Sequence, residues 1–248
     1  MSKYKVEVEY LGTGYSGWQS QDNSNTIQSA IEEAVFKFCG ERVCVYGCGR
    51  TDAGVHAYRM PAHIEFAKEY DPYKILMAVN FHLKYAGHTI SLLTVEPVLE
   101  DFHARFSCKM RHYVYLICNR TTRPVIMDGR VWWVYHPLNV EAMNKVAQNL
   151  VGKHDFSTFR ASECQAKSPI KTLSKISVVR KDDDMIEVRV SARSFLYHQV
   201  RNIVGTLALV GQGKWSEEDF VRAFNACDRR CGGPTAPADG LYFDYAEY

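Results

Sequence analysis

The alternation of apolar and polar positions predicts strands along much of the chain. From Lys3 to Tyr10 every second residue is apolar, which is typical of a strand with one buried face. The segment Arg111–Cys118 alternates in the same way and places Tyr113 and Tyr115 on one face. Similar runs predict further strands at residues 43–46, 62–66, 90–96, 131–135, 173–180 and 185–192.

Apolar residues at helical spacing predict helices between these strands, and capping residues set their expected limits. The first predicted helix lies between an N-cap at Asn25 and a stop at Gly40, and the second begins at Asp71 and Pro72. The third runs from Asn139 to Gly152. A largely apolar helix follows over 196–210, and the last begins at Ser216. Strands outnumber helices and the hairpins are local. We therefore expect an α+β fold, made of two similar halves that each have an antiparallel sheet and helices.

The chain has 248 residues, of which 46% are hydrophobic. This is enough for one large domain or two compact ones. The sequence has no linker rich in Pro, Gly or Ser, and we expect domains at residues 1–104 and 105–248.

Basic residues are concentrated in the second part of the chain. The net charge is only +2, but residues 1–100 carry −3 and residues 101–248 carry +5. Six basic residues lie in 105–130, where Asp128 is the one acid, and seven lie in 153–181. Such clusters are typical of a surface that binds a polyanion such as RNA, although an ordinary solvated surface has the same composition.

The sequence shows neither a secretory signal pattern nor an apolar run long enough to span a bilayer. We therefore expect a cytoplasmic protein, no membrane association, and eight cysteines that are reduced thiols. Two pairs of cysteines are spaced by four residues, but no C-x-x-C pair occurs, so buried thiols are favoured over a zinc site.

The segment Gly49–His56 is the strongest candidate for chemistry. It follows a predicted strand and has Asp52 as its one acid. Glycine allows sharp turns and close backbone approach, and an ionised carboxylate can act as a nucleophile or a general base. The alternative is a turn in which Thr51 and Asp52 cap backbone N–H groups.

Two arginines are candidate partners for Asp52. Arg50 lies two residues away, and Arg201 lies on the side of its helix opposite the apolar stripe. A guanidinium on such a helix needs a partner or solvent. A pair with Asp52 would lower the pKa of the carboxyl group and fix its direction.

Tyr113 and Tyr115 share a strand face with Arg111. Aromatic side chains on a sheet can stack on unpaired bases, whereas a buried aromatic pair is the commoner outcome. The clustered Arg105, Lys109 and Arg111 favour RNA. The sequence contains no P-loop, G-x-G-x-x-G, H-E-x-x-H or G-x-S-x-G motif, and its histidines show no metal-ligand spacing.

Taken together, these segments resemble the TruA family of tRNA pseudouridine synthases over essentially the whole chain. The resemblance rests on Gly12…Gly17-Trp18-Gln19…Gln21, Gly49–Ala57, Asp101–Ser107, Arg111–Tyr115, His154–Arg160, Phe195–Gly205 and Gly240-Leu241. The chain departs from the family pattern at Leu11, where an acid is usual, and at Leu83–Ile90, which replaces an L-P-x-D-I segment.

The resemblance implies isomerisation of uridine to pseudouridine at positions 38, 39 and 40 of the tRNA anticodon stem-loop. It implies the pseudouridine synthase fold, with two sheets that merge across a central basic cleft, a homodimer, and neither cofactor nor metal. Asp52 would be the catalytic aspartate, Tyr113 the tyrosine that stacks on the target base, and Arg201 the arginine paired with Asp52. The basic residues expected to contact RNA are Arg50, Arg105, Lys109, Arg111 and Arg160.

Two other functions compete with this interpretation. One is a non-catalytic RNA-binding module that uses the same sheet and basic cleft. The other is a metal-dependent nuclease built on Asp52 and histidines, which EDTA would inhibit.

Overall fold

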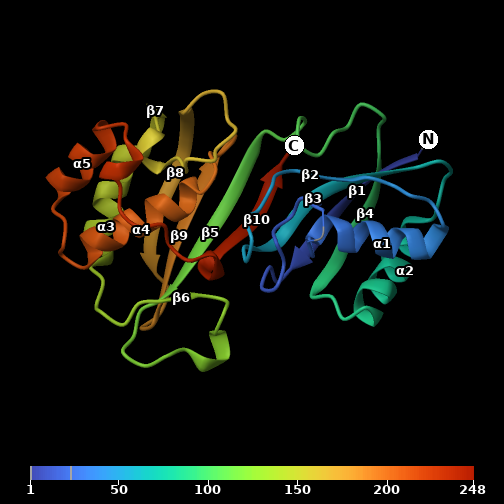
Figure 1. The fold of residues 1–248 in the computed structure, drawn as a ribbon, viewed down its shortest axis with the longest axis horizontal. Coiled ribbons are helices and arrows are strands. Elements are labelled where there is room, and N and C mark those ends of the chain that lie inside the picture. Colours follow the sequence, from blue (N-terminus) through green and yellow to red (C-terminus); the bar gives the residue numbers. More distant parts are fainter. Residues whose placement is uncertain (1, 23) are drawn as a thin grey trace. The chain divides into compact units, whose positions relative to one another are not determined.

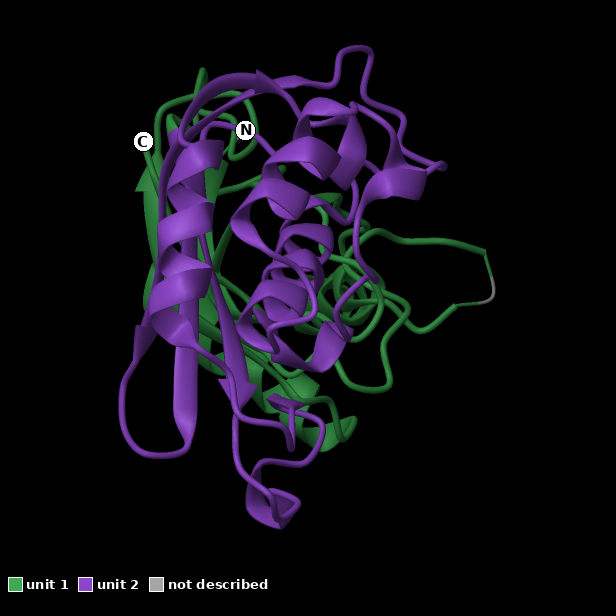
Figure 2. Ribbon diagram, turned by 90° about the vertical axis from the view of Figure 1, so that its left-hand side faces the viewer, with its two compact units in different colours: residues 1–109, 242–248 green, residues 110–241 purple. Residues whose placement is uncertain are grey.

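The computed structural model describes residues 2–22 and 24–248. The chain forms two compact units, shown in different colours in Figure 2. The first unit contains residues 1–109 and 242–248, and the second contains residues 110–241. No helix in the described part of the chain has the length and apolar character needed to cross a membrane.

A mixed sheet forms the centre of the first unit (Figure 1). Its strands are β1 (Ser2–Tyr10), β2 (Val45–Gly47), β3 (His56–Phe66), β4 (Ile90–Val98) and β10 (Leu241–Glu247). The order is β4-β1-β3-β10, with β2 added to β3. All these pairs are antiparallel except β10, which runs parallel to β3.

Two helices cover this sheet. They are α1 (Ile27–Cys39) and α2 (Pro72–Tyr85), and they pack against each other. Proline occupies the start of α2, and the Asp71 carboxylate accepts the Tyr73 N–H, as expected for an N-cap. On β1 the predicted alternation is confirmed, because the four inward apolar side chains are no more than 2% exposed: Tyr4, Val6, Val8 and Tyr10.

In the second unit the main strands pair antiparallel in the order β5-β9-β8-β7. Its strands are β5 (Met110–Cys118), β6 (Trp132–Trp133, parallel to β5), β7 (Gly152–Asp155), β8 (Ile170–Arg180) and β9 (Met185–Ala192). Its helices are α3 (Val140–Ala147), α4 (Gln199–Gly211) and α5 (Glu217–Asn225). Short 3-10 turns lie at Val125–Met127, Gln148–Leu150, Ser157–Phe159, Arg229–Cys231 and Ala238–Gly240.

Helix α4 is the central helix of the second unit, and eleven of its 13 residues are buried. Two of its buried polar side chains, Asn202 and Thr206, have specific partners. The Asn202 amide donates to the Phe159 carbonyl at 2.9 Å, and the Thr206 hydroxyl donates to the Asn202 carbonyl at 2.7 Å. An almost wholly apolar helix is thereby buried without orphaned groups at these positions.

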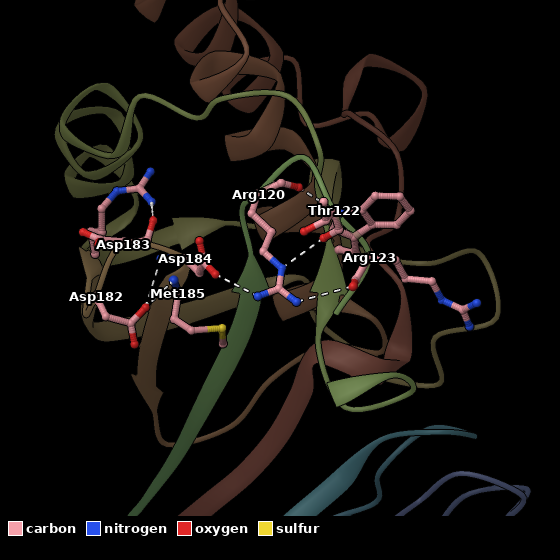
Figure 3. A network of polar contacts seen from close by, with 9 residues as sticks. Arg120, Thr122, Arg123, Asp182, Asp183, Asp184 and Met185 are labelled. Atoms are coloured by element: carbon pink, nitrogen blue, oxygen red, sulfur yellow. Dashed lines mark hydrogen bonds and ion pairs between the residues drawn. The ribbon is translucent and has the colours of Figure 1, made fainter. Parts of the chain in front are cut away.

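A polar network fixes the turn between β8 and β9 (Figure 3). The Arg120 guanidinium donates to the Asp184 carboxylate at 2.9 Å and to the Thr122 carbonyl at 3.0 Å. The Asp182 carboxylate accepts the N–H groups of Asp184 and Met185. The acidic turn is therefore a self-capped hairpin that also anchors the segment after β5.

The predicted α+β class is confirmed, whereas several predicted boundaries are wrong. Helix α1 is capped by Thr26, whose hydroxyl accepts the Ser29 N–H, while the Asn25 amide donates to Gly14. Helix α4 begins at Gln199, because the Gln199 side chain accepts the Leu196 N–H and holds a turn before the helix.

Glycine 152 does not stop α3. The helix ends at Ala147 and continues as a 3-10 turn, and Gly152 instead opens β7 with a φ of 112°. The predicted division after residue 104 also differs from the two compact units. Residues 242–248 join the first unit, because β10 pairs with β3.

Candidate active site

The Asp52 loop connects β2 to β3 through a tight turn. The Val55 N–H donates to the Asp52 carbonyl at 3.2 Å, and Gly54 has a φ of 79°. This left-handed conformation favours glycine. Asp52 is half-buried at this turn, and Arg50 is exposed.

A second segment, residues 11–18, supports the Asp52 loop through its backbone. The Trp18 N–H donates to the Thr51 carbonyl at 3.1 Å, and the Gly54 N–H donates to the Tyr15 carbonyl at 3.3 Å. The Gly12 N–H donates to Nδ1 of the fully buried His56 at 2.9 Å. The loop is therefore held on both sides of Asp52.

Glycine is required where these two segments meet. A Cβ on Gly12 would lie 2.0 Å from the Val55 carbonyl oxygen, and one on Gly17 would lie 2.6 Å from the Thr51 carbonyl oxygen. Both distances are below van der Waals contact with backbone atoms, so no larger residue fits without a shift of the chain. These glycines bring the supporting segment within hydrogen-bond distance of the Asp52 loop.

Side chains add a second support beneath the loop. The hydroxyl groups of Tyr10 and Thr51 form a hydrogen bond at 2.8 Å, and both side chains are buried. The Trp18 ring packs on Gly47 and lies 5.9 Å from the Tyr10 ring, between centroids. The Gln28 N–H, in the first turn of α1, donates to the Trp18 carbonyl at 3.0 Å.

In the second unit, Tyr113 lies on β5 at the border of the core. Its side chain is 9% exposed and packs edge-to-face on Phe195, with 5.0 Å between ring centroids. Tyr115, two residues along the same face, is fully buried and donates to the Pro237 carbonyl at 2.7 Å. Burial raises the pKa of Tyr115 well above its usual value. Tyr115 is thus a core residue.

Arg201 lies on α4 and is half-buried. Its Nε donates to the Ala236 carbonyl at 2.8 Å, and its own carbonyl accepts the Ala236 N–H at 3.1 Å. One turn further on, a Cβ on Gly205 would lie 1.9 Å from the Pro234 carbonyl oxygen. The side of α4 that faces away from its apolar stripe is therefore covered by segment 234–236, which orients the guanidinium.

The other basic candidates differ in their surroundings. Arg105 and Lys109 are exposed in the first unit. In the second unit the Arg111 guanidinium donates to the Arg193 carbonyl. Arg160 donates to the carbonyls of Cys164 and Ala166, each at 2.8 Å. Contact of these residues with RNA stays a prediction.

The candidates are divided between the two units. Arg50 and Asp52 belong to the first, and Tyr113 and Arg201 belong to the second. The pairing of Asp52 with Arg201 stays a prediction. In the described part of the chain, no group of three or more His, Cys, Asp or Glu side chains is placed to hold a metal ion.

The contact between Tyr10 and Thr51 is not predicted by the sequence. Both residues are visible in the sequence, but their contact joins positions 41 residues apart. The sequence feature most closely related to this contact is the glycine-rich segment that begins at Gly12.

Known proteins resemble this chain over its full length. A family model described as tRNA pseudouridine synthase matches residues 146–248. The tRNA pseudouridine synthase A of Rhodospirillum centenum is 53% identical over 248 residues, which is 100% of both chains. The protein of the same name from Rhodospirillum rubrum is 52% identical over 243 residues, 98% of this chain and 86% of the relative. A solved archaeal box H/ACA sRNP Nop10-Cbf5 complex covers 94% of this chain and 61% of its own, with 10% identity and a TM-score of 0.35.

Proposed function

The chain belongs to the tRNA pseudouridine synthase A family and is an isomerase, and we propose that it converts uridine to pseudouridine in tRNA. The target is the anticodon stem-loop, at positions 38, 39 and 40. The observation that carries the proposal is the 53% identity to a tRNA pseudouridine synthase A over 100% of both chains.

The reaction exchanges one bond to the ribose for another. The bond between N1 of uracil and C1′ breaks, the base rotates, and a bond between C5 and C1′ forms. The proton on C5 is then lost to solvent, and N1 gains a proton. No atom is added overall, so the reaction needs no oxidant and no second substrate, and our proposal includes neither a metal nor an organic cofactor.

Asp52 is the proposed catalytic carboxylate. It is half-buried on a turn that is held from both sides, which supports this role. A carboxylate in this position can attack the base, attack the sugar or assist removal of a proton from the sugar. The proposal requires only that Asp52 is ionised and reaches the target nucleotide.

Tyr113 and Arg201 complete the proposed site. The target base must first leave its stack in the RNA, which costs a few kcal/mol of free energy. Stacking on the Tyr113 ring would offset about 1–3 kcal/mol of this cost. The bond from Arg201 Nε to the Ala236 carbonyl fixes the direction of the guanidinium. A cation held in this way could form a charge-assisted hydrogen bond with the Asp52 carboxylate and orient it.

Basic residues hold the RNA in this proposal. Arg50, Arg105, Lys109, Arg111 and Arg160 contact phosphates, so affinity for tRNA falls as the salt concentration rises. We further propose that the protein acts in the cytoplasm as a homodimer, in line with the family that it resembles.

Tritium release tests the proposed reaction. Unmodified tRNA labelled with tritium at uridine C5 is incubated with the purified protein, and released tritium reports the loss of the C5 proton. We expect release of up to one equivalent per target uridine. Mapping pseudouridine in the product should place it at positions 38, 39 and 40.

The same assay separates the competing functions. Absence of release together with tight tRNA binding would favour an RNA-binding module. A reaction abolished by EDTA, with cleaved RNA, would favour a nuclease. Full release in EDTA with intact tRNA supports the proposal, and pseudouridine at other positions would contradict the anticodon stem-loop assignment.

A further inference from the structure

We propose that the buried pair of hydroxyl groups on Tyr10 and Thr51 positions the Asp52 carboxylate for reaction. The inference rests on the proposed function, in which Asp52 is the catalytic group. It assigns a positioning role to these two residues and leaves the reaction itself to Asp52.

The pair joins two separate parts of the first unit. Tyr10 is the last residue of β1, and Thr51 immediately precedes Asp52 in the chain. Their hydroxyl oxygens are 2.8 Å apart, with Tyr10 2% exposed and Thr51 7% exposed. Water is therefore largely excluded from this bond, and the loop is tied to a central strand of the sheet.

The backbone is fixed at Thr51 and at Asp52 itself. The Thr51 carbonyl accepts the Trp18 N–H, and the Asp52 carbonyl accepts the Val55 N–H. With the Thr51 side chain also bonded, residue 51 is held by both its side chain and its backbone. The direction in which the next residue projects then has little freedom.

Supporting residues leave the pair little room to shift. Trp18 packs beside Tyr10 and against Gly47, the last residue of β2. Gly17 approaches the Thr51 carbonyl so closely that a Cβ there would lie 2.6 Å from it. The hydroxyl pair is thus the polar centre of a tightly packed region, and its loss would change the angle of the Asp52 loop without removing any group that binds RNA.

The test compares variants that differ by one hydroxyl group. Thr51→Val and Tyr10→Phe each remove one hydroxyl and keep the shape, whereas Thr51→Ser keeps the hydroxyl. We expect the first two to slow single-turnover tritium release by about 10- to 100-fold, the effect of a small misplacement of a catalytic group. Thr51→Ser should stay within about three-fold of the wild type, and all variants should bind tRNA within about three-fold.

The double variant separates positioning from stability. Each single variant breaks the Tyr10–Thr51 hydrogen bond and keeps one of its two hydroxyl groups, whereas Tyr10→Phe with Thr51→Val removes both hydroxyl groups together. We expect the double variant to regain the melting temperature of the wild type but to react as slowly as either single variant. A rate that recovers together with the melting temperature would overturn the proposal.

Tyr4→Phe is the matched control. Tyr4 lies on the same strand, is equally buried, and its hydroxyl donates to the Tyr70 carbonyl at 2.7 Å, away from the Asp52 loop. It should lower the melting temperature and leave the rate unchanged. If Thr51→Val and Tyr10→Phe also leave the rate unchanged while Asp52→Asn abolishes it, the positioning role is wrong and the proposed function stands. If the wild type releases no tritium, both fail.

Discussion

At the scale of single residues, buried polar side chains of the first unit are held by specific donors and acceptors. His63 on β3 is 1% exposed, and its Nδ1 accepts the Ala104 N–H at 3.2 Å. The ring therefore carries its proton on Nε2, 3.8 Å from the Glu65 carboxylate. Burial, followed by the charges of His103 and Lys3, lowers the pKa of His63 from 6.5 to about 4.

This pKa predicts a loss of stability in mild acid. Between pH 6.5 and about 4 the unfolded chain binds a proton at His63 that the folded chain does not bind. The free energy of unfolding therefore falls as the pH decreases through this range, by up to about 3 kcal/mol. Chemical denaturation at a series of pH values measures the slope.

The matched variant is His63→Asn, because the Asn side-chain oxygen can replace Nδ1 as the acceptor for Ala104. It should flatten the slope between pH 6.5 and 4, whatever its effect on stability at neutral pH. An unchanged slope would show that His63 is not the group responsible.

At the scale of elements, the Asp52 loop and segment 11–18 form one structural unit. They exchange backbone hydrogen bonds on both sides of Asp52, and Gly12 and Gly17 allow the contact. The close approach at Gly12 involves a backbone carbonyl, which cannot rotate away as a side chain would.

The close approach at Gly12 predicts that alanine substitutions at Gly12 and Gly14 lower stability by different amounts. Gly12→Ala should lower the free energy of unfolding by about 3 kcal/mol, the upper end of the range for overpacking. A Cβ on Gly14 would meet no atom within 4 Å, and only the backbone φ of 84° disfavours alanine there. Gly14→Ala should therefore lower the free energy of unfolding by about 1 kcal/mol. Urea denaturation gives both values, and equal losses would mean that the space around Gly12 adjusts.

Elements with a regular apolar pattern could be predicted from the sequence. Strands β1 and β9 and the start of α2 follow directly from alternation and from an Asp-Pro cap. Strands β7 and β10 were missed. β7 has four residues, and β10 pairs parallel with a strand almost 200 residues earlier, which no local pattern reveals. Asp52 stood out by its motif, whereas its support by Tyr10 depends on register and packing.

At the scale of the whole molecule, the first unit is built from both ends of the chain. Strand β10 pairs with β3, with Tyr242 opposite His56 at the end of the Asp52 loop. The proposed catalytic groups are also divided, with Asp52 in one unit and Tyr113 and Arg201 in the other. Activity in this account therefore requires both units.

The proposed pairing of Arg201 with Asp52 predicts a specific effect for Arg201→Met. Loss of the guanidinium should slow single-turnover tritium release by about 10²- to 10³-fold, as expected when an electrostatic partner of a reacting group is removed. Affinity for tRNA should change by less than about three-fold. Arg229→Met is the control, because Arg229 is also half-buried in the second unit, and its guanidinium donates to Asn202 and Thr235. Equal losses of rate and affinity for Arg201→Met would indicate a role in docking or folding.

Single-turnover tritium release by Asp52→Asn tests the central claim most directly. The variant keeps the shape of the side chain and removes its charge, so the account predicts no detectable release, with affinity for tRNA within a few-fold of the wild type and an unchanged melting temperature. Release at a rate near that of the wild type would show that the carboxylate takes no part in the reaction, and would contradict the account.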